Sequence, residues 1–336
     1  MKRLNYIGSK FQLLDWITEA ILEKTGWDSV KGKRIADLFS GTGVVSYHFR
    51  LLGSEVYSND TERYSAVISH ALTKSTFTRK CREFIERSQN KSTVGYITRE
   101  YSPYEGNQRM FFTVENAMKI DGIREALETE KDQMSHDEFQ FLLASLVLSA
   151  DAVSNVPAVY GCYLKNFKKK ALKTLDFQAI HENTSEPLPG STVYNRDVSD
   201  GPRFETHFDA VYLDPPYNER QYSKNYFPLN MIVQSSSEPL KGKTGIPVEC
   251  FVSPFCKKTQ VEESFQRLIG NISAHWVFLS YSSESLISRD KMIAILGSYG
   301  TVSVKERDYK RFKSFEYNDG GQTVQEYLFC LQKFNV

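Results

Sequence analysis

The chain has 336 residues, of which 40% are hydrophobic and 25% charged, and its formal net charge is +1 at pH 7. This ordinary globular composition allows one large domain or two. The sequence has no apolar run of about eighteen residues and no apolar signal core, so we expect a cytoplasmic protein that binds no membrane. The five cysteines are an odd number and widely spaced, without a C-x-x-C pair, which predicts a reducing compartment and no structural metal.

The N-terminal part of the chain predicts a helix followed by an alternating strand and helix unit. Apolar residues recur at helical spacing over 11–22. Two short strands, 33–39 and 55–59, are each followed by a segment of helical character, 44–52 and 62–73. A strand, helix and strand in this order are typical of a right-handed parallel crossover.

The rest of the chain predicts an α/β sheet interrupted by an insertion. Residues 76–189 lack the strand and helix rhythm and contain a strongly apolar helix candidate. Strand patterns return afterwards, at 191–194, 208–213, 276–281, 300–304 and 325–331. The last two predict an antiparallel pair. We therefore expect a catalytic domain formed by 1–75 and 190–336 and an inserted, mostly helical region at 76–189.

A glycine-containing loop follows the first predicted strand. Residues 37–43 read DLFSGTG, so that two glycines lie where a strand changes to a helix and a ligand can approach the backbone at a helix N-terminus. The loop lacks the third glycine of the dinucleotide fingerprint and is not a phosphate-binding P-loop. Asp60, at the end of the next strand, can accept hydrogen bonds from ribose hydroxyls. The pattern predicts a nucleoside-like ligand, and a tight turn without a ligand is the alternative.

A stiff tetrapeptide, Asp214-Pro215-Pro216-Tyr217, follows the predicted strand 208–213. Ligands of open α/β sheets bind at the carboxyl ends of the strands. Each proline fixes φ and lacks an N–H, so the carbonyl oxygens of Asp214 and Pro215 stay available as acceptors. A planar amino group would fit there, with Tyr217 stacked on its ring.

Two basic stretches contain interleaved aromatic residues. The stretch 165–173 holds five lysines and no acid, and 305–313 holds five basic residues against two acidic ones. Such runs on loops are typical of contacts to the phosphates of a nucleic acid, and a solvated surface is the alternative. The candidate nucleic-acid-binding residues are Lys165, Lys168, Lys169, Lys170, Tyr309, Lys310, Arg311 and Lys313.

Several segments resemble, in their order, the motifs of S-adenosylmethionine-dependent DNA adenine-N6 methyltransferases of the alpha group, which contains the Dam methylases. These segments are 5–10, 37–43, Asp60, 195–197 and 214–217. The resemblance implies a Rossmann-like methyltransferase sheet with S-adenosylmethionine as cofactor. It also implies a target-recognition function for the insertion and double-stranded DNA as partner, with a cognate restriction endonuclease if the enzyme is of the restriction-modification type. The enzyme would lie in the cytoplasm, associated with the nucleoid when on DNA.

The same resemblance implies roles for single residues. The cofactor-binding residues would be Tyr6, Lys10, Asp37, Phe39, Ser40, Gly41, Gly43, Asp60 and Asp197. Among them, Lys10 would bind the methionyl carboxylate, Asp60 the ribose hydroxyls and Asp197 the adenine amine of the cofactor. The catalytic residues would be Asp214, Pro215, Pro216 and Tyr217, around a flipped adenine. No metal is implied.

The chemistry can be argued from the residues alone. Hydrogen bonds from an aromatic amine to Asp214 and a carbonyl oxygen favour a pyramidal nitrogen, and methyl transfer from a sulfonium is a direct displacement that needs positioning and electrostatics. The chain has no Pro-Cys dipeptide of the kind that cytosine-ring methylation requires. An amino-methyltransferase of RNA or of protein glutamine and a catalytically silent DNA-binding subunit are the alternatives.

Overall fold

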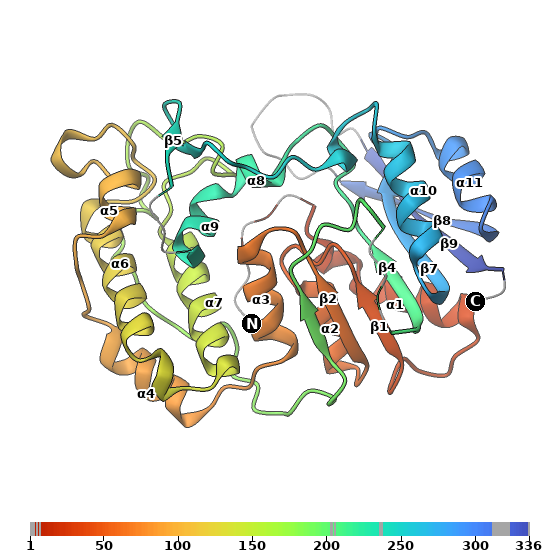
Figure 1. Ribbon diagram of the computed structural model, residues 1–336, viewed down its shortest axis with the longest axis horizontal. Coiled ribbons are helices and arrows are strands. Elements are labelled where there is room, and N and C mark those ends of the chain that lie inside the picture. Colours follow the sequence, from red (N-terminus) through yellow and green to blue (C-terminus); the bar gives the residue numbers. More distant parts are fainter. Residues whose placement is uncertain are drawn as a thin grey trace. The chain divides into compact units, whose positions relative to one another are not determined.

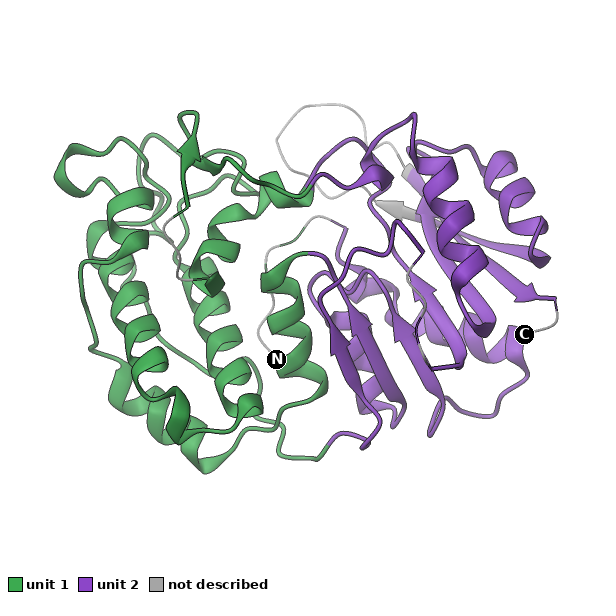
Figure 2. Cartoon of the chain, viewed as in Figure 1, with its two compact units in different colours: residues 1–7, 62–186, 222–251 green, residues 8–61, 187–221, 252–336 purple. Residues whose placement is uncertain are grey.

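The computed structural model describes Leu4, Tyr6 and residues 8–201, 204, 206–234, 238–310 and 323–334. The chain forms two compact units (Figure 2). Unit 1 comprises residues 1–7, 62–186 and 222–251, and unit 2 comprises 8–61, 187–221 and 252–336.

Unit 2 contains a seven-stranded sheet with the order β3-β2-β1-β4-β7-β9-β8 (Figure 1). Its strands are β1 (Arg34–Asp37), β2 (Glu55–Asn59), β3 (Thr192–Tyr194), β4 (Phe208–Leu213), β7 (Ala274–Ser282), β8 (Gly300–Lys310) and β9 (Thr323–Lys333). The pairs β3-β2, β2-β1, β1-β4 and β4-β7 are parallel, whereas β9 is antiparallel to both β7 and β8. The predicted α/β sheet with a C-terminal antiparallel pair is confirmed. Because β9 is reversed, it begins at the edge where the parallel strands end.

Helices cover both faces of this sheet (Figure 1). Alternating residues of β4 explain why: Ala210 and Tyr212 pack in one core, and Val211 and Leu213 pack in the other. The first core includes residues of α1 (Leu14–Thr25) and α2 (Val44–Leu51), and the second includes residues of α10 (Val261–Asn271) and α11 (Arg289–Gly297). Short 3-10 helices lie at Lys10–Leu13 and Pro254–Cys256. The helices α10 and α11 were not among the elements predicted from the sequence.

Unit 1 is mostly helical and also contains the short strand pair β5 (Leu240–Lys241) and β6 (Ile246–Pro247). Its α-helices are α3 (Arg63–Thr73), α4 (Arg79–Ser88), α5 (Tyr96–Tyr101), α6 (Val114–Thr129), α7 (His136–Ala152), α8 (Tyr222–Asn225) and α9 (Phe227–Gln234), with 3-10 helices at Tyr104–Gly106 and Lys131–Gln133. The predicted apolar helix is α7. A capping box formed by Ser135 and Glu138 lies at its N-terminus. It is buried along nearly its whole length, as expected for a central helix.

Unit 1 is larger than the insertion predicted at 76–189. It also includes α3 and the segment 222–251. The reason is packing, since α3 and α9 both contact the central helix α7. Sequence patterns do not reveal such contacts between distant segments.

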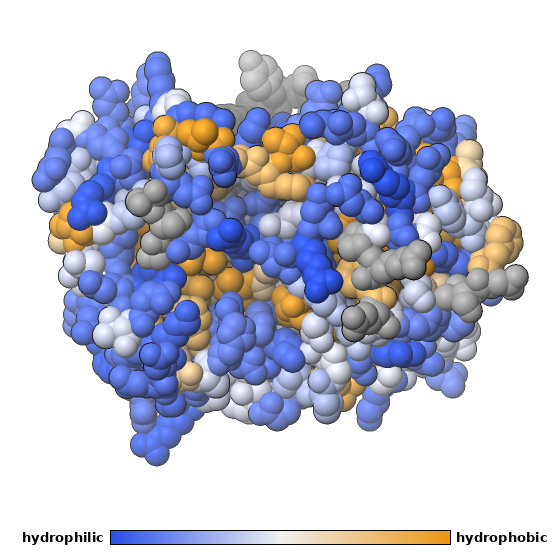
Figure 3. Space-filling model, in the orientation of Figure 1, coloured by the Kyte–Doolittle hydropathy of each residue, from blue (hydrophilic) through white to orange (hydrophobic). Residues whose placement is uncertain are grey.

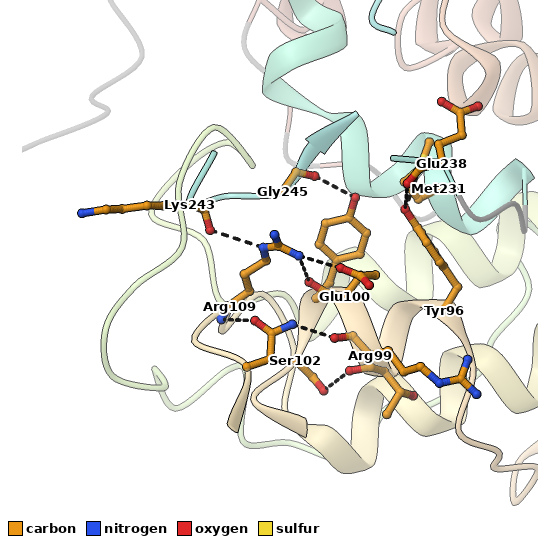
Figure 4. A network of polar contacts seen from close by, with 12 residues as sticks. Tyr96, Arg99, Glu100, Ser102, Arg109, Met231, Glu238, Lys243 and Gly245 are labelled. Atoms are coloured by element: carbon orange, nitrogen blue, oxygen red, sulfur yellow. Dashed lines mark hydrogen bonds and ion pairs between the residues drawn. The ribbon is translucent and has the colours of Figure 1, made fainter. Parts of the chain in front are cut away.

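A polar network joins the β5–β6 hairpin to α5 (Figure 4). Arg109 donates to the side chain of Glu100 at 2.7 Å and to the carbonyl of Lys243 at 3.3 Å, and Tyr101 donates to the carbonyl of Gly245 at 3.0 Å. A Cβ at Gly245 would lie 2.8 Å from Arg109, and its φ of +71° also favours glycine. The hairpin is therefore held by side chains of the helical region.

A mostly hydrophilic surface is expected from the ordinary globular composition of the chain. Hydrophilic side chains cover most of the face shown in Figure 3. Within the described residues, no helix is long and apolar enough to cross a membrane.

Candidate active site

Three acidic residues predicted as site residues lie at one edge of the unit 2 sheet. Asp37 is the last residue of β1, Asp60 directly follows β2, and Asp214 directly follows β4. These strands are adjacent and parallel, and Asp37 pairs with Ser58 of β2 and Tyr212 of β4. The carboxyl edge of the sheet therefore brings together residues that are far apart in the sequence.

The glycine loop has the geometry that its sequence predicts. Gly41 and Gly43 have φ values of 50° and 70°, and Gly43 is the N-cap of α2. Left-handed conformations of this kind favour glycine over residues with a Cβ. The amide of Ser40 donates to the carbonyl of Asn59 at 2.9 Å, and the amide of Gly41 donates to Asp60 Oδ2 at 2.8 Å. The loop is thereby fixed against the end of β2.

Asp37 is fully buried and has one free acceptor. Its Oδ2 accepts a hydrogen bond from Ser46 Oγ at 2.7 Å, whereas Oδ1 is buried and has no hydrogen-bond partner among the described residues. Burial raises the pKa of Asp37 to about 7, with Asp214 and Asp60 adding to the rise and Ser46 opposing it. Buried acceptors are nearly always satisfied, so Oδ1 fits a donor brought by a ligand, such as an amino group.

Lys10 joins the ends of β4 and β9. Its Nζ lies 3.2 Å from Asp214 Oδ1 and 3.4 Å from Glu326 Oε1, and the side chain is only 3% exposed. Burial alone would lower the pKa of Lys10, but Asp214 and Glu326 outweigh it and raise that pKa well above the usual range. Burial raises the pKa of Asp214 to about 6, against the opposing effect of Lys10 and with a further rise from Glu326. The ammonium is thus shared by two carboxylates.

Sequence reasoning missed Glu326 and Ser46. Glu326 is the single acid near the start of β9, followed by five buried residues. A lone charge beginning an otherwise apolar strand is a signal that could have marked it, because buried charges are rare unless they are paired. Ser46 lies on the first turn of α2 and carries no comparable signal.

Aromatic rings lie beside the acidic residues. The Lys10 ammonium is 5.6 Å from the centroid of the Tyr217 ring, and the Tyr217 carbonyl accepts from the Leu286 amide at 2.9 Å. Phe39 packs edge-on against Phe255, with 5.2 Å between ring centroids. Pro215 is buried and Pro216 half-buried, so the tetrapeptide lies against the protein with the Tyr217 ring partly accessible.

The segment after β3 reaches the end of β2. Asn195 Nδ2 donates to the Asp60 carbonyl at 2.7 Å. Asp197 is exposed, and its two carboxylate oxygens accept from the amide and the hydroxyl of Ser199 at 2.8 and 2.9 Å. The structure thus ties this segment to Asp60, while the carboxylate of Asp197 is engaged in a local turn.

Tyr6 belongs to unit 1, whereas the other predicted cofactor residues belong to unit 2. Its ring stacks on Tyr222 and Tyr226, with centroids 5.3 and 4.7 Å away, and its hydroxyl accepts from Tyr64 Oη at 3.4 Å. Tyr6 is therefore part of an aromatic cluster in unit 1.

The lysine run of unit 1 contains residues in different environments. Lys165 and Lys169 are exposed and Lys170 is half-buried. Lys168 Nζ donates to the carbonyl of Val156, and partial burial and Lys170 lower its pKa. Exposure thus favours Lys165 and Lys169 over Lys168 as contacts for a partner.

The candidate side chains of the second basic stretch, 305–313, lie outside the described part of the structure. Arg311 and Lys313 are not described, and only the backbone of Tyr309 and Lys310, at the end of β8, is described. Within the described ranges, no cluster of three or more His, Cys, Asp or Glu side chains could hold a metal ion.

Comparison with known proteins gives matches that span most or nearly all of this chain. A family model for D12 class N6 adenine-specific DNA methyltransferases matches residues 6–295. The chain is 43% identical over 334 residues to the type II methyltransferase M.CviAII of Paramecium bursaria Chlorella virus 1, covering 98% of each chain. It is 36% identical over 338 residues to the type II methyltransferase M.NlaIII of Neisseria lactamica, covering 98% of this chain and 99% of that one. It is also 33% identical to the type II methyltransferase M.FokI of Planomicrobium okeanokoites, covering 98% of this chain and 53% of that one.

Proposed function

This chain belongs to the D12 class N6 adenine-specific DNA methyltransferases, and from that membership we propose how its residues carry out the reaction. The enzyme methylates the exocyclic amino group of adenine in DNA, with S-adenosylmethionine as methyl donor. The observation that carries the proposed site is the position of Asp214 at the carboxyl edge of the sheet, beside Asp37 and Asp60.

We propose that the Asp214 carboxylate and the Pro215 carbonyl accept hydrogen bonds from the target amine. The amine lone pair is delocalised into the ring, and hydrogen bonds from its N–H groups draw the nitrogen towards a pyramidal shape. Asp214 also stabilises the positive charge that develops on this nitrogen during the displacement. The ring of Tyr217 would stack on the flipped adenine, which offsets part of the few kcal/mol that unstacking costs.

The cofactor pocket is proposed on the loop 37–43 and its neighbours. When bound, S-adenosylmethionine supplies an electrophilic methyl group on its sulfonium. The buried free oxygen of Asp37 fits the cofactor's amino group, and the left-handed backbone at Gly41 and Gly43 leaves room for close approach. Asp60 would accept from the ribose hydroxyls beside its bond from the Gly41 amide. An ammonium has three N–H donors, so Lys10 can bind the cofactor carboxylate as well as its two acidic partners.

Four further cofactor residues are proposed from the resemblance. Phe39 and Ser40 would line the methionyl end, where Ser40 is buried and Phe39 is partly accessible. Asp197 would bind the cofactor adenine after exchanging its bonds to Ser199. For Tyr6 we propose a contact with the cofactor's methionyl end, as the resemblance implies.

The overall function can be tested by comparing methyl transfer to three classes of substrate. Purified protein is incubated with labelled S-adenosylmethionine and, separately, with duplex DNA, tRNA or protein. Label is expected in DNA, on adenine N6. Label only in RNA or protein would support the amino-methyltransferase alternative, and absence of transfer to every substrate would support a silent DNA-binding subunit.

We propose that unit 1 carries target recognition and that its exposed lysines contact DNA phosphates. Replacing Lys165 and Lys169 together with glutamine should weaken binding to duplexes of any sequence. Each lost phosphate contact should reduce the slope of log K against log salt by about 0.9. Fluorescence anisotropy across a salt series measures both effects.

The matched control replaces Lys91 and Lys131, two exposed lysines of unit 1 outside the run. This variant should keep the wild-type slope. An unchanged slope in the Lys165 and Lys169 variant would assign that run to a solvated surface.

We further propose that the enzyme is the modification part of a restriction-modification system, since the relatives above are type II methyltransferases. Its partner would be an endonuclease that cuts the same site, and the enzyme would act in the cytoplasm on nucleoid DNA. Sequencing modified adenines in DNA from cells expressing the chain would give the recognition site. Resistance of that DNA to an endonuclease of the same specificity would support the pairing.

A further inference from the structure

Glu326 is a buried carboxylate at the proposed active site. It is 5% exposed, lies opposite Ser282 of β7, and accepts from Lys10 at 3.4 Å. Its other oxygen, Oε2, is buried without a hydrogen-bond partner among the described residues. A buried charge with one free oxygen costs free energy, and a buried ion pair is weak support for stability. Its position beside Lys10 and Asp214 therefore suggests a role in the reaction.

Lys10 creates an electrostatic problem for Asp214. An ammonium 3.2 Å from the carboxylate weakens that carboxylate as an acceptor for the amine and as a counter-charge for the nitrogen. The effect is strong because the ammonium is buried and the carboxylate is largely covered, with 3% and 17% of the two side chains exposed. A second carboxylate on the same ammonium reduces it, since Lys10, Asp214 and Glu326 together then carry one net negative charge.

We propose that Glu326 is a positioning residue that acts as the second counter-ion of Lys10 and so keeps the Asp214 carboxylate available to the target amine. This inference rests on the proposed role of Asp214 as acceptor. It explains why the reversed strand β9 places an acid at this edge of the sheet.

The directions of the pKa shifts at Asp214 agree with this role of Glu326. Burial is the largest cause of the raised pKa of Asp214, Lys10 lowers that pKa, and Glu326 raises it again. A higher pKa of the carboxylate means a stronger hydrogen-bond acceptor once it is ionised. The titratable groups that interact with Asp214 are Lys10, Asp37, Tyr212, Tyr217 and Glu326.

The main test is the isosteric substitution Glu326→Gln in the full chain. It removes the charge but keeps an oxygen for Lys10. At pH 8 we expect kcat to fall about tenfold, less than for loss of a direct contact to the reacting group. Lys10 then pairs more strongly with Asp214, so the acid limb of kcat/KM should move to lower pH. A change at a merely structural residue would not move this limb.

The matched control is Glu306→Gln, on an exposed acid of the neighbouring strand β8. It should keep the wild-type kcat and acid limb. If Glu326→Gln shows an unchanged kcat, or a limb that stays in place or moves to higher pH, the inference is overturned.

A second variant, Glu326→Asp, keeps the charge and guards against poor folding of the first. Its acid limb should stay near the wild-type position and its kcat should exceed that of Glu326→Gln. A loss as large as that of Glu326→Gln would overturn the inference. Asp214→Ala is measured in parallel: if it stays active, the proposed role of Asp214 fails, whereas an inactive Asp214→Ala with a normal Glu326→Gln rejects the inference alone.

Discussion

Replacing Asp214 with alanine is expected to lower kcat for DNA methylation by roughly a hundred- to a thousandfold. The substitution removes the acceptor that orients the amine and the charge that stabilises its developing positive charge. These contacts are made to the reacting group, so the loss should fall on kcat rather than on cofactor affinity. Single-turnover transfer of labelled methyl groups to duplex DNA measures the rate, and isothermal titration measures the affinity.

The fold should tolerate Asp214→Ala. Lys10 keeps Glu326 as its partner, so the change does not leave an unpaired buried ammonium. The matched control is Asp209→Asn, near the other end of β4, where the carboxylate accepts from the Arg34 amide. It should keep kcat close to wild type. An Asp214→Ala variant with near-normal turnover would refute the proposed catalytic role.

The pH dependence of the wild-type enzyme provides a further readout of Asp214. Its pKa is raised by burial to about 6. The acceptor function needs the ionised form, so kcat/KM for DNA, measured with S-adenosylmethionine saturating at every pH, should decline as the pH falls through about 6. This is the limb whose movement the Glu326 variants test.

Replacing Asp37 with asparagine is expected to weaken S-adenosylmethionine binding at pH 8 by about ten- to a hundredfold, the range for a hydrogen bond to a charged group. The free oxygen Oδ1 is the proposed acceptor for the cofactor's amino group. The pKa of Asp37 is raised by burial to about 7, so wild-type affinity should increase from pH 6 to pH 8 as this group ionises. Asp37→Asn should remove that increase.

The same substitution should stabilise the cofactor-free protein at pH 8. The pKa of Asp37 is about 7 in the folded chain, whereas the ordinary pKa of a free Asp side chain is 3.8. Between these two pH values the carboxyl group is protonated in the folded chain and ionised in the unfolded chain. Its contribution to stability is therefore lost as the pH rises towards and through about 7, by up to a few kcal/mol. Denaturant unfolding of both proteins at pH 5 and pH 8 measures the difference.

The control for both effects is Asp28→Asn, on an exposed acid of unit 2. It should change neither the cofactor affinity nor the stability difference between pH 5 and pH 8. Wild-type binding that does not depend on pH, or an Asp37→Asn variant that binds as tightly as wild type, would contradict the proposed contact.

The amino-acid sequence was sufficient for the elements whose signals are local. Apolar runs bounded by turns predicted β2 and β4 at their observed limits, and alternation with helices predicted the parallel order. The positions of Asp37, Asp60 and Asp214 followed, because residues after parallel strands meet at one edge. In contrast, α10 and α11 were missed, since helices that pack on a sheet owe most of their stability to tertiary contacts.

The sequence by itself determined the α/β class, the order of the motifs and the family they resemble. The tertiary structure alone decided the charge arrangement of the site. Lys10 and Glu326 are 316 positions apart, and they meet because β9 is inserted in reverse beside β7. Likewise, the free oxygen of Asp37 and the bond of Lys168 to a carbonyl depend on neighbours from other segments. Long-range pairing sets which charges share a buried space, and no local pattern in the chain encodes that pairing.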